Sequence, residues 1–288
     1  MKVTVISKKE FENLQPLELG SEVCNSESRV CHFWVNGEHK VLKILNELEG
    51  EYFAFKMYTI SMLDYYKDYL LPSLHIPDSL AACDGNTIGF TIPFVEGINL
   101  ATILNSAKFP FHLKIFYLRK IGFILEQLRD MRESTSLKDF YLNDIHESNF
   151  VANLATGELG VLDLDSSKIR HNGVYPARYA SICSLVQCNS KKYKVNESGV
   201  CGGYIIPNND SEIYCYIMTI LNFILAGNFY RVRLNNFYDY LDHLDFFGFD
   251  KELLSVFERI ILPEPNINPE PYLETLTLKQ MKRVRSLF

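Results

Sequence analysis

Two turn dipeptides near the N-terminus constrain the fold of this chain more than any other feature. Asn36-Gly37 separates RVCHFWV from EHKVLKIL, and Asp84-Gly85 separates SLAAC from NTIGFTIPFV. Each dipeptide suits a two-residue type I′ turn and is flanked by β-rich runs, so each predicts a β-hairpin. The stretch 51–69 between the hairpins contains no Gly or Pro and predicts a helix. The N-terminal third of the chain is therefore expected to form an antiparallel sheet with one helix.

The character of the chain changes after Gly97. Apolar residues then recur at spacings of three and four: Leu113, Tyr117, Ile121, Ile124, Leu128 and Met131. This spacing predicts an amphipathic helix. A short hairpin around Thr156-Gly157 follows, and further helices are expected at 212–226, 236–247 and 251–262. Strands first and helices later indicate an α+β fold, in which the segment 93–99 separates residues 1–95 from residues 96–288.

Composition and charge exclude several classes of protein. Of the 288 residues, 47% are hydrophobic and 22% are charged, which is ordinary for a globular chain and excludes disorder. The net charge of −6 gives no sign of the basic surface that nucleic-acid binding requires, so no nucleic-acid partner is expected.

The cysteines and the apolar segments bear on the location of the protein. Its seven cysteines are odd in number and contain no CxxC pair, which favours reduced thiols and a cytoplasmic location. The N-terminal residues do not have the pattern of a signal peptide. The uncharged stretch 213–230 is interpreted as a buried helix, so no membrane span is expected.

One segment, YLNDIHESNFVANLATGELGVLDLDSSKI at 141–169, carries the residues best suited to chemistry. Asp144, His146 and Asn149 lie on one loop, and Asp163 and Asp165 end the apolar strand that returns from the hairpin. A carboxylate and an amide that face each other across a hairpin can supply the hard oxygen ligands of Mg²⁺, usually together with substrate phosphates. Asp144 is then left to orient a hydroxyl nucleophile. The alternative is that Asp144 is a turn residue and Asn149 caps a strand.

This segment resembles the catalytic loop and metal-binding strand of the protein kinase-like superfamily, and the resemblance extends over nearly the whole chain. It implies a bilobal fold, with a small antiparallel-sheet lobe containing one helix and a larger, mostly helical lobe. It also implies ATP and Mg²⁺ as cofactors, Asp144 as the catalytic base, and Asn149 and Asp163 as the metal ligands. Asp165 stands where the family's DFG motif has Gly. His146 belongs to a D-x-H-x-x-N loop similar to that of bacterial atypical kinases, aminoglycoside phosphotransferases and choline kinases.

The resemblance also assigns roles near the first hairpin. Lys43 lies in the apolar strand KVLKIL, as expected of the lysine that contacts the α- and β-phosphates. The alternative is a strand-end lysine that reaches water. Its partner glutamate is expected in the following helix, where Glu51 is the first choice and Glu47 and Glu49 are the alternatives. Val30 is expected to cover the nucleotide base.

Two further segments are compared with the same family. TIPFVEGINL resembles the hinge that meets adenine, with Ile92 as gatekeeper, hydrogen bonds from the Pro93 carbonyl and the Val95 N–H, and Asn99 reaching the ribose. The alternative is an edge strand that enters a turn. Glu212 resembles the acid that opens the central helix of the large lobe. The candidate phosphate loop, residues 20–30, contains a single glycine, which leaves weak or unusual nucleotide binding open.

Three functions remain open at this point. The favoured one is a kinase that transfers the γ-phosphate to Ser or Thr of a protein or peptide, because Gly97 and Asp144 are too close in sequence for an inserted substrate-binding subdomain. The D-x-H-x-x-N loop instead favours a small-molecule kinase of the aminoglycoside or choline type. The poor phosphate loop favours a nucleotide-binding pseudokinase. An unrelated α+β domain with coincident acids is a fourth, bland alternative, and the oligomeric state is open.

Overall fold

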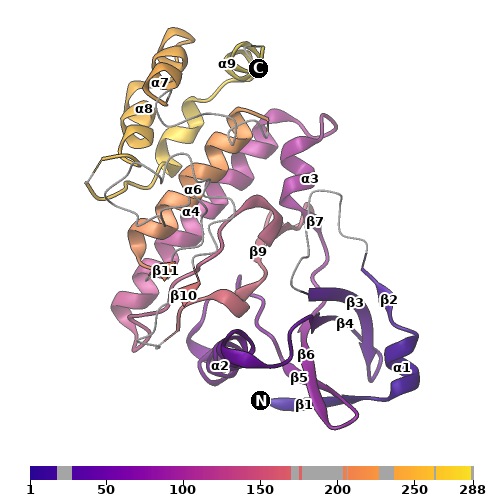
Figure 1. The fold of residues 1–288 in the computed structure, drawn as a ribbon. Helices are drawn as coiled ribbons and strands as arrows, with labels where there is room; N and C mark the ends of the chain where they lie inside the picture. Colours follow the sequence, from indigo (N-terminus) through magenta and orange to yellow (C-terminus); the bar gives the residue numbers. More distant parts are fainter. Residues whose placement is uncertain are drawn as a thin grey trace.

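The computed structural model of this chain describes residues 1–17, 28–169, 175–176, 204–205, 207–226, 237–262 and 264–286. These residues form a six-stranded mixed sheet, a three-stranded antiparallel sheet and several helices, which confirms the α+β class (Figure 1). The six-stranded sheet comes from the first hundred residues, and most of the helices follow it in the chain.

The six-stranded sheet has the strand order β1-β5-β6-β4-β3-β2. Its strands are β1 (Lys2–Ile6), β2 (Gln15–Pro16), β3 (Ser28–Val35), β4 (Glu38–Leu45), β5 (Ser79–Cys83) and β6 (Asn86–Pro93). Neighbouring strands are antiparallel except for β1, which pairs in parallel with β5. The sheet is therefore mixed, and not purely antiparallel as the two hairpins predict.

Both predicted hairpins are present. Asn36 and Gly37 have φ angles of 51° and 84°, and Asp84 and Gly85 have φ angles of 49° and 80°. These positive values are what a type I′ turn requires. The register of the first hairpin places Val30 directly opposite Lys43, so that these two residues share one face of the sheet.

Gly89 on β6 allows a close approach to β4. It lies opposite Ile44, and a Cβ atom added at Gly89 would lie 1.9 Å from the carbonyl oxygen of Lys43. A larger residue would push β6 away from the strand that carries Lys43. Glycine at this position therefore fixes where the backbone of Lys43 lies.

Different segments cover the two faces of the sheet. The chain runs from β1 through α1 (Lys8–Glu12) to β2, and so connects the two opposite edges (Figure 1). Beneath this connection lies an apolar cluster that consists of Ile6, Leu14, Cys31, Phe33, Leu42, Ile44, Ala81 and Ile88. The other face packs against α2 (Gly50–Tyr65) through a second apolar cluster, which consists of Leu45, Ile60, Phe90 and Ile92. After α2 the chain continues into a 3₁₀ turn at Lys67–Tyr69.

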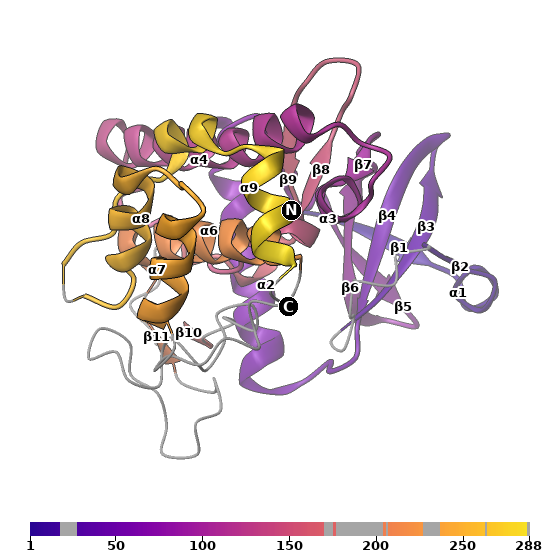
Figure 2. The same ribbon diagram turned by 90° about the horizontal axis from the view of Figure 1, so that it is seen from above.

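The helices after the sheet form the second half of the structure. They are α3 (Leu100–Asn105), α4 (Phe111–Ser134), α6 (Asn209–Ile224), α7 (Phe237–Phe246), α8 (Lys251–Glu258) and α9 (Leu278–Arg285), with a 3₁₀ helix at Glu270–Thr275. Most of them gather on the side away from the six-stranded sheet, whereas α3 lies next to β7 (Figure 2). The predicted apolar stripe of α4 is buried, with Tyr117, Ile121 and Leu128 at most 1% exposed. Among the described residues, no helix has the length and apolar character that crossing a membrane requires.

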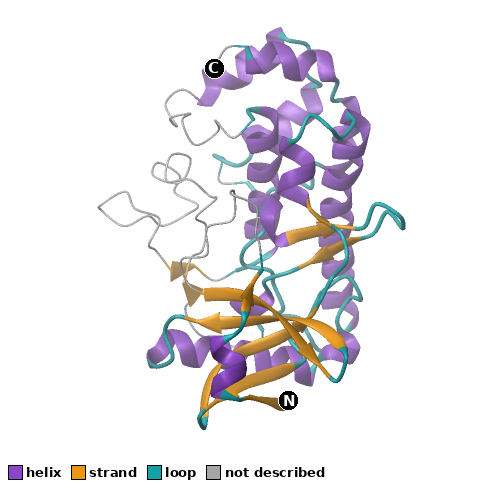
Figure 3. Cartoon of the chain, turned by 90° about the vertical axis from the view of Figure 1, so that its right-hand side faces the viewer, coloured by secondary structure: helices purple, strands orange, loops and turns teal. Residues whose placement is uncertain are grey.

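A three-stranded sheet lies between the large sheet and the helices (Figure 3). It has the order β7-β8-β9, formed by β7 (Ile98–Asn99), β8 (Phe150–Ala152) and β9 (Leu159–Val161), and a separate pair joins β10 (Tyr175–Pro176) to β11 (Tyr204–Ile205). β8 and β9 form the hairpin predicted around Thr156-Gly157. Short 3₁₀ turns at Glu147–Asn149 and Leu164–Ser166 flank this hairpin and contain Asn149 and Asp165.

Candidate functional site

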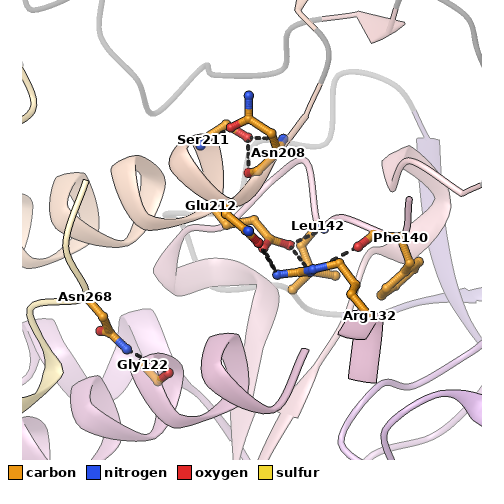
Figure 4. Close-up of polar contacts among 9 residues, drawn as sticks. Gly122, Arg132, Phe140, Leu142, Asn208, Ser211, Glu212 and Asn268 are labelled. Atoms are coloured by element: carbon orange, nitrogen blue, oxygen red, sulfur yellow. Dashed lines mark hydrogen bonds and ion pairs between the residues drawn. The ribbon is translucent and has the colours of Figure 1, made fainter. Parts of the chain in front are cut away.

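Glu212 anchors the loop 141–149 to the helices. It lies in the first turn of α6 and is 1% exposed. Its Oε1 accepts a hydrogen bond from the Leu142 N–H at 2.7 Å, and its Oε2 accepts one from Arg132 at 2.9 Å (Figure 4). Arg132, near the end of α4, also donates to the Phe140 carbonyl at 3.0 Å. One buried ion pair thus joins α4, α6 and the start of the loop that carries Asp144.

The protonation of Glu212 should make stability depend on pH. Burial raises the pKa of Glu212 to about 7, although Arg132 and the Leu142 N–H lower it. Between the unfolded pKa near 4.5 and pH 7, the folded chain holds a proton that the unfolded chain has lost, so stability falls as pH rises. The measured quantity is the difference in free energy of unfolding between wild type and Glu212→Gln. We expect this difference to fall by on the order of 3 kcal/mol from pH 4 to pH 8. Urea titrations at several pH values measure it, and a difference that does not change with pH would contradict the assignment.

The D-x-H-x-x-N loop is held by contacts within itself. The Asn149 side-chain N–H donates to the Asp144 carbonyl at 2.9 Å, and the Ser148 N–H donates to His146 Nδ1 at 3.2 Å. His146 Nε2 lies 3.6 Å from Asp144 Oδ1. Burial lowers the pKa of His146, but Asp144 and other carboxylates raise it by more, so the net shift is upward. His146 can therefore carry a proton beside the Asp144 carboxylate.

Asp163 follows β9 in a left-handed backbone conformation, with φ 59° and ψ 46°. This conformation is uncommon for a residue other than Gly, and Asp and Asn tolerate it best. The Leu162 N–H donates to the Asn149 carbonyl at 2.8 Å, so the β8–β9 hairpin brings Asn149 next to the residue before Asp163. The Asp163 side chain is 34% exposed and therefore accessible to a ligand.

Lys43 reaches these acids from β4. Its Nζ forms an ion pair with Asp163 and lies 3.2 Å from each carboxylate oxygen of Asp165. Burial lowers the pKa of Lys43, but the two carboxylates raise it by more, so Lys43 stays charged. Burial also raises the pKa of Asp163; Lys43 lowers it and the neighbouring Asp165 raises it, and the net shift is upward. Residues 120 positions apart in the sequence are joined here.

The residue that α2 contributes to this cluster is a lysine. Lys56 forms an ion pair with Asp165, and both side chains are 1% exposed. Burial raises the pKa of Asp165, but Lys43 and Lys56 together lower it well below its ordinary value. No motif or spacing in the sequence singles out Lys56. The only sequence feature that could have indicated a buried cation here is Asp165, an acid at a position where the resemblance expects Gly.

The expected glutamate partner of Lys43 is wrong. Glu51 is exposed at the start of α2, and the alternatives Glu47 and Glu49 are exposed just before it. Within the described residues, these three acids form no hydrogen bond or ion pair. Lys43 pairs with Asp163 and Asp165 instead, and an acid on α2 would repel Asp165.

Two of the proposed base-contacting residues, Val30 and Ile92, lie on the face of the sheet that carries Lys43. Val30 is half-buried opposite Lys43, and Ile92 is 9% exposed opposite Val41. Pro93 ends β6 and is exposed, and Val95 is half-buried in the segment that follows. Most of the candidate phosphate loop, residues 20–27 of 20–30, lies outside the described residues.

Asn99 has a structural role that differs from the expected contact with a ribose. Its Oδ1 accepts from the Ala101 N–H at 2.9 Å and so caps α3. Its side-chain N–H donates to the Ser148 carbonyl at 2.7 Å. Asn99 therefore joins the start of α3 to the 141–149 loop.

Asn149 and Asp163 offer hard oxygen atoms, but too few to enclose a cation. Asn149 is 8% exposed, and among the residues that the structure describes its Oδ1 accepts no hydrogen bond. No cluster of three or more His, Cys, Asp or Glu side chains in those residues could hold a metal ion. Mg²⁺ usually takes only one or two protein carboxylates and completes its shell with water and substrate phosphates. The two residues therefore fit Mg²⁺ that is bound together with a phosphate-bearing ligand.

Comparison with known proteins adds no family assignment. No protein-family model matches the chain, and no curated protein matches it. The function must therefore be inferred from the geometry of the site, where β4, α2, the 141–149 loop and the turn after β9 meet.

Proposed function

We propose that this chain is an ATP- and Mg²⁺-dependent phosphotransferase with a bilobal, protein kinase-like fold. In this proposal residues 1–95 form the nucleotide-binding lobe and residues 96–288 form the catalytic lobe. The observation that carries the proposal is the contact between Lys43 on β4 and Asp163 after β9. It brings a buried cation, suited to phosphates, next to a carboxylate suited to a metal ion. Asn149 and Asp144 lie on the loop that the same hairpin holds in place.

In this proposal each side chain of the site has a distinct role in phosphate transfer. Lys43 binds the α- and β-phosphates, and Asn149 Oδ1 and Asp163 hold Mg²⁺, which neutralises charge on the phosphates when it is bound. Asp144 orients the acceptor hydroxyl, whose oxygen attacks the γ-phosphorus, and takes the hydroxyl proton as ADP leaves. His146, whose Nε2 lies 3.6 Å from Asp144 Oδ1, assists by stabilising the negative charge of that carboxylate.

The acceptor is most simply a Ser or Thr of a protein or peptide. Between Gly97 and Asp144 the chain forms only β7, α3 and α4 with short connections. That stretch has no inserted helical subdomain to enclose a small substrate. The placement of His146 beside Asp144 supports the second candidate, a small-molecule kinase.

Nucleotide binding gives the direct test. We expect ATP with Mg²⁺ to raise the thermal unfolding midpoint, because a ligand at 100 times its dissociation constant adds about 2.7 kcal/mol. ATP with a chelator should give a much smaller rise. Trp34, the only tryptophan, is on the same strand as Val30 and stacks on His39 with ring centroids 4.5 Å apart, so its fluorescence offers a second readout.

The outcomes separate the candidate functions. No midpoint shift at millimolar ATP and Mg²⁺ would reject the proposal. Binding followed by transfer to a generic basic protein supports a protein kinase, and transfer only to hydroxyl-bearing metabolites supports the second candidate. Binding without any transfer would identify a pseudokinase.

A further inference from the structure

Lys56 and Asp165 form a buried ion pair directly behind Lys43. Each side chain is 1% exposed, and the Lys56 Nζ also lies 5.0 Å from the centre of the Tyr52 ring. Lysine and aspartate are almost never this deeply buried unless they are paired. The proposed function assigns no role to either residue, so the pair needs an explanation of its own.

Lys43 and three other charged side chains form a chain of alternating sign. Lys56 contacts Asp165, Asp165 contacts Lys43, and Lys43 contacts Asp163. Two cations and two anions balance one another. Burying an ion costs several kcal/mol, and removal of one partner leaves the other uncompensated. Each inner member of the chain, Asp165 and Lys43, therefore depends on two neighbours.

The two aspartates differ in what a ligand can reach. The Asp163 side chain is 34% exposed, whereas that of Asp165 is 1% exposed. A cation that arrives with a nucleotide can therefore bind Asp163 but not Asp165. When Asp163 binds such a cation, Lys43 loses one of its two carboxylate partners and keeps the other.

We propose that Asp165 is the residue that positions Lys43 for the phosphates, and that Lys56 holds Asp165 in place. The inference rests on the proposed function, because it concerns Lys43 in its nucleotide-binding role. Lys56 is too deeply buried to contact a ligand and acts through Asp165. This arrangement explains why the buried residue on α2 is a lysine. When a buried aspartate positions Lys43, a cation on the helix balances the charge of that aspartate.

Single substitutions test the two positioning residues separately. We expect Lys56→Met and Asp165→Ala each to raise the dissociation constant for a non-hydrolysable ATP analogue with Mg²⁺ at least tenfold, which is about 1.4 kcal/mol. KM for ATP should rise more than kcat falls. Lys56→Arg keeps the charge and should bind the analogue nearly as wild type does. Affinities are measured below the unfolding midpoint of each variant, so that a purely structural role would change the midpoint but not the affinity.

A charge exchange gives the sharper test. Lys56→Glu alone places an acid against Asp165, and Asp165→Ala alone leaves Lys43 and Lys56 without their shared acid. Combined in one chain, the two substitutions offer Lys43 an acid on α2 and leave no second buried acid behind it. We expect each single variant to lose at least tenfold in affinity and the double variant to recover most of that loss, a strong departure from additivity.

The outcomes distinguish the inference from the proposed function. A double variant that binds no better than the weaker single variant would overturn the positioning role, as would folded Lys56→Met and Asp165→Ala variants with wild-type affinity. If Lys56→Glu does not fold, the comparison of Lys56→Met with Lys56→Arg decides, and equal affinities would reject the inference. Wild type that binds no ATP with Mg²⁺ would reject the proposed function, and the inference with it.

Discussion

Asp144→Asn should lower phosphate transfer by on the order of 10²- to 10⁴-fold, the usual contribution of a positioned general base. Nucleotide affinity should change little, because Asp144 is not one of the side chains assigned to the phosphates or to Mg²⁺. The substitution keeps the backbone carbonyl that accepts the hydrogen bond from Asn149. It removes only the carboxylate that faces His146 at 3.6 Å. The measurement compares transfer rates with the dissociation constant for ATP in the same preparation.

A matched control for this variant is Glu51→Gln. Glu51 is an exposed acid on α2 that forms no hydrogen bond or ion pair with the described residues. Its substitution should change neither the transfer rate nor the affinity for ATP. Equal activity in Asp144→Asn and wild type would remove Asp144 from the mechanism. A large loss of transfer rate or ATP affinity in Glu51→Gln would support Glu51 as the partner of Lys43, as the resemblance implies.

Asp163→Asn should abolish the dependence of ATP binding on Mg²⁺. Asparagine tolerates the left-handed conformation at this position, with φ 59°, so a loss of binding would not reflect backbone strain. The substitution removes the half-buried, ligand-accessible carboxylate, whereas Lys43 keeps its contact with Asp165. We expect ATP with Mg²⁺ to bind no better than ATP with a chelator, and transfer to fall at least as far as in Asp144→Asn.

Calorimetric titration of ATP with and without Mg²⁺ measures this effect. Glu158→Gln is the control, because Glu158 is an exposed acid on the same β8–β9 hairpin. It should keep the full Mg²⁺ dependence. If Asp163→Asn also keeps that dependence, the metal ligands lie elsewhere in the chain.

Much of the fold could be predicted because its signals are local. The Asn36-Gly37 and Asp84-Gly85 dipeptides specify their turns by backbone conformation alone, and the spacing of apolar residues along 111–134 specifies one buried helix face. The parallel pairing of β1 with β5 could not be predicted in this way. It joins residues more than seventy positions apart, and no local pattern identifies such a partner.

The charged contacts of the candidate site also could not be predicted from local sequence patterns. A resemblance transfers residue types position by position, and it led to a glutamate partner for Lys43. Asp165, at a position where glycine was expected, changes the charge that α2 must supply. Only the contact between Lys56 and Asp165, 109 positions apart, makes this dependence visible. The unexpected aspartate at position 165 is balanced in space by Lys56, which no sequence pattern singles out.

The segment from β1 through α1 to β2 has a consequence for solubility. The outermost strands of the six-stranded sheet, β1 and β2, both belong to residues 2–16. Open sheet edges present unpaired N–H and C=O groups that can recruit strands from other molecules. Because β1 pairs with β5 and β2 pairs with the middle of β3, loss of this one segment would expose backbone groups of β5 and β3 together. Fraying of the N-terminal residues would therefore open the sheet to aggregation from both sides at once.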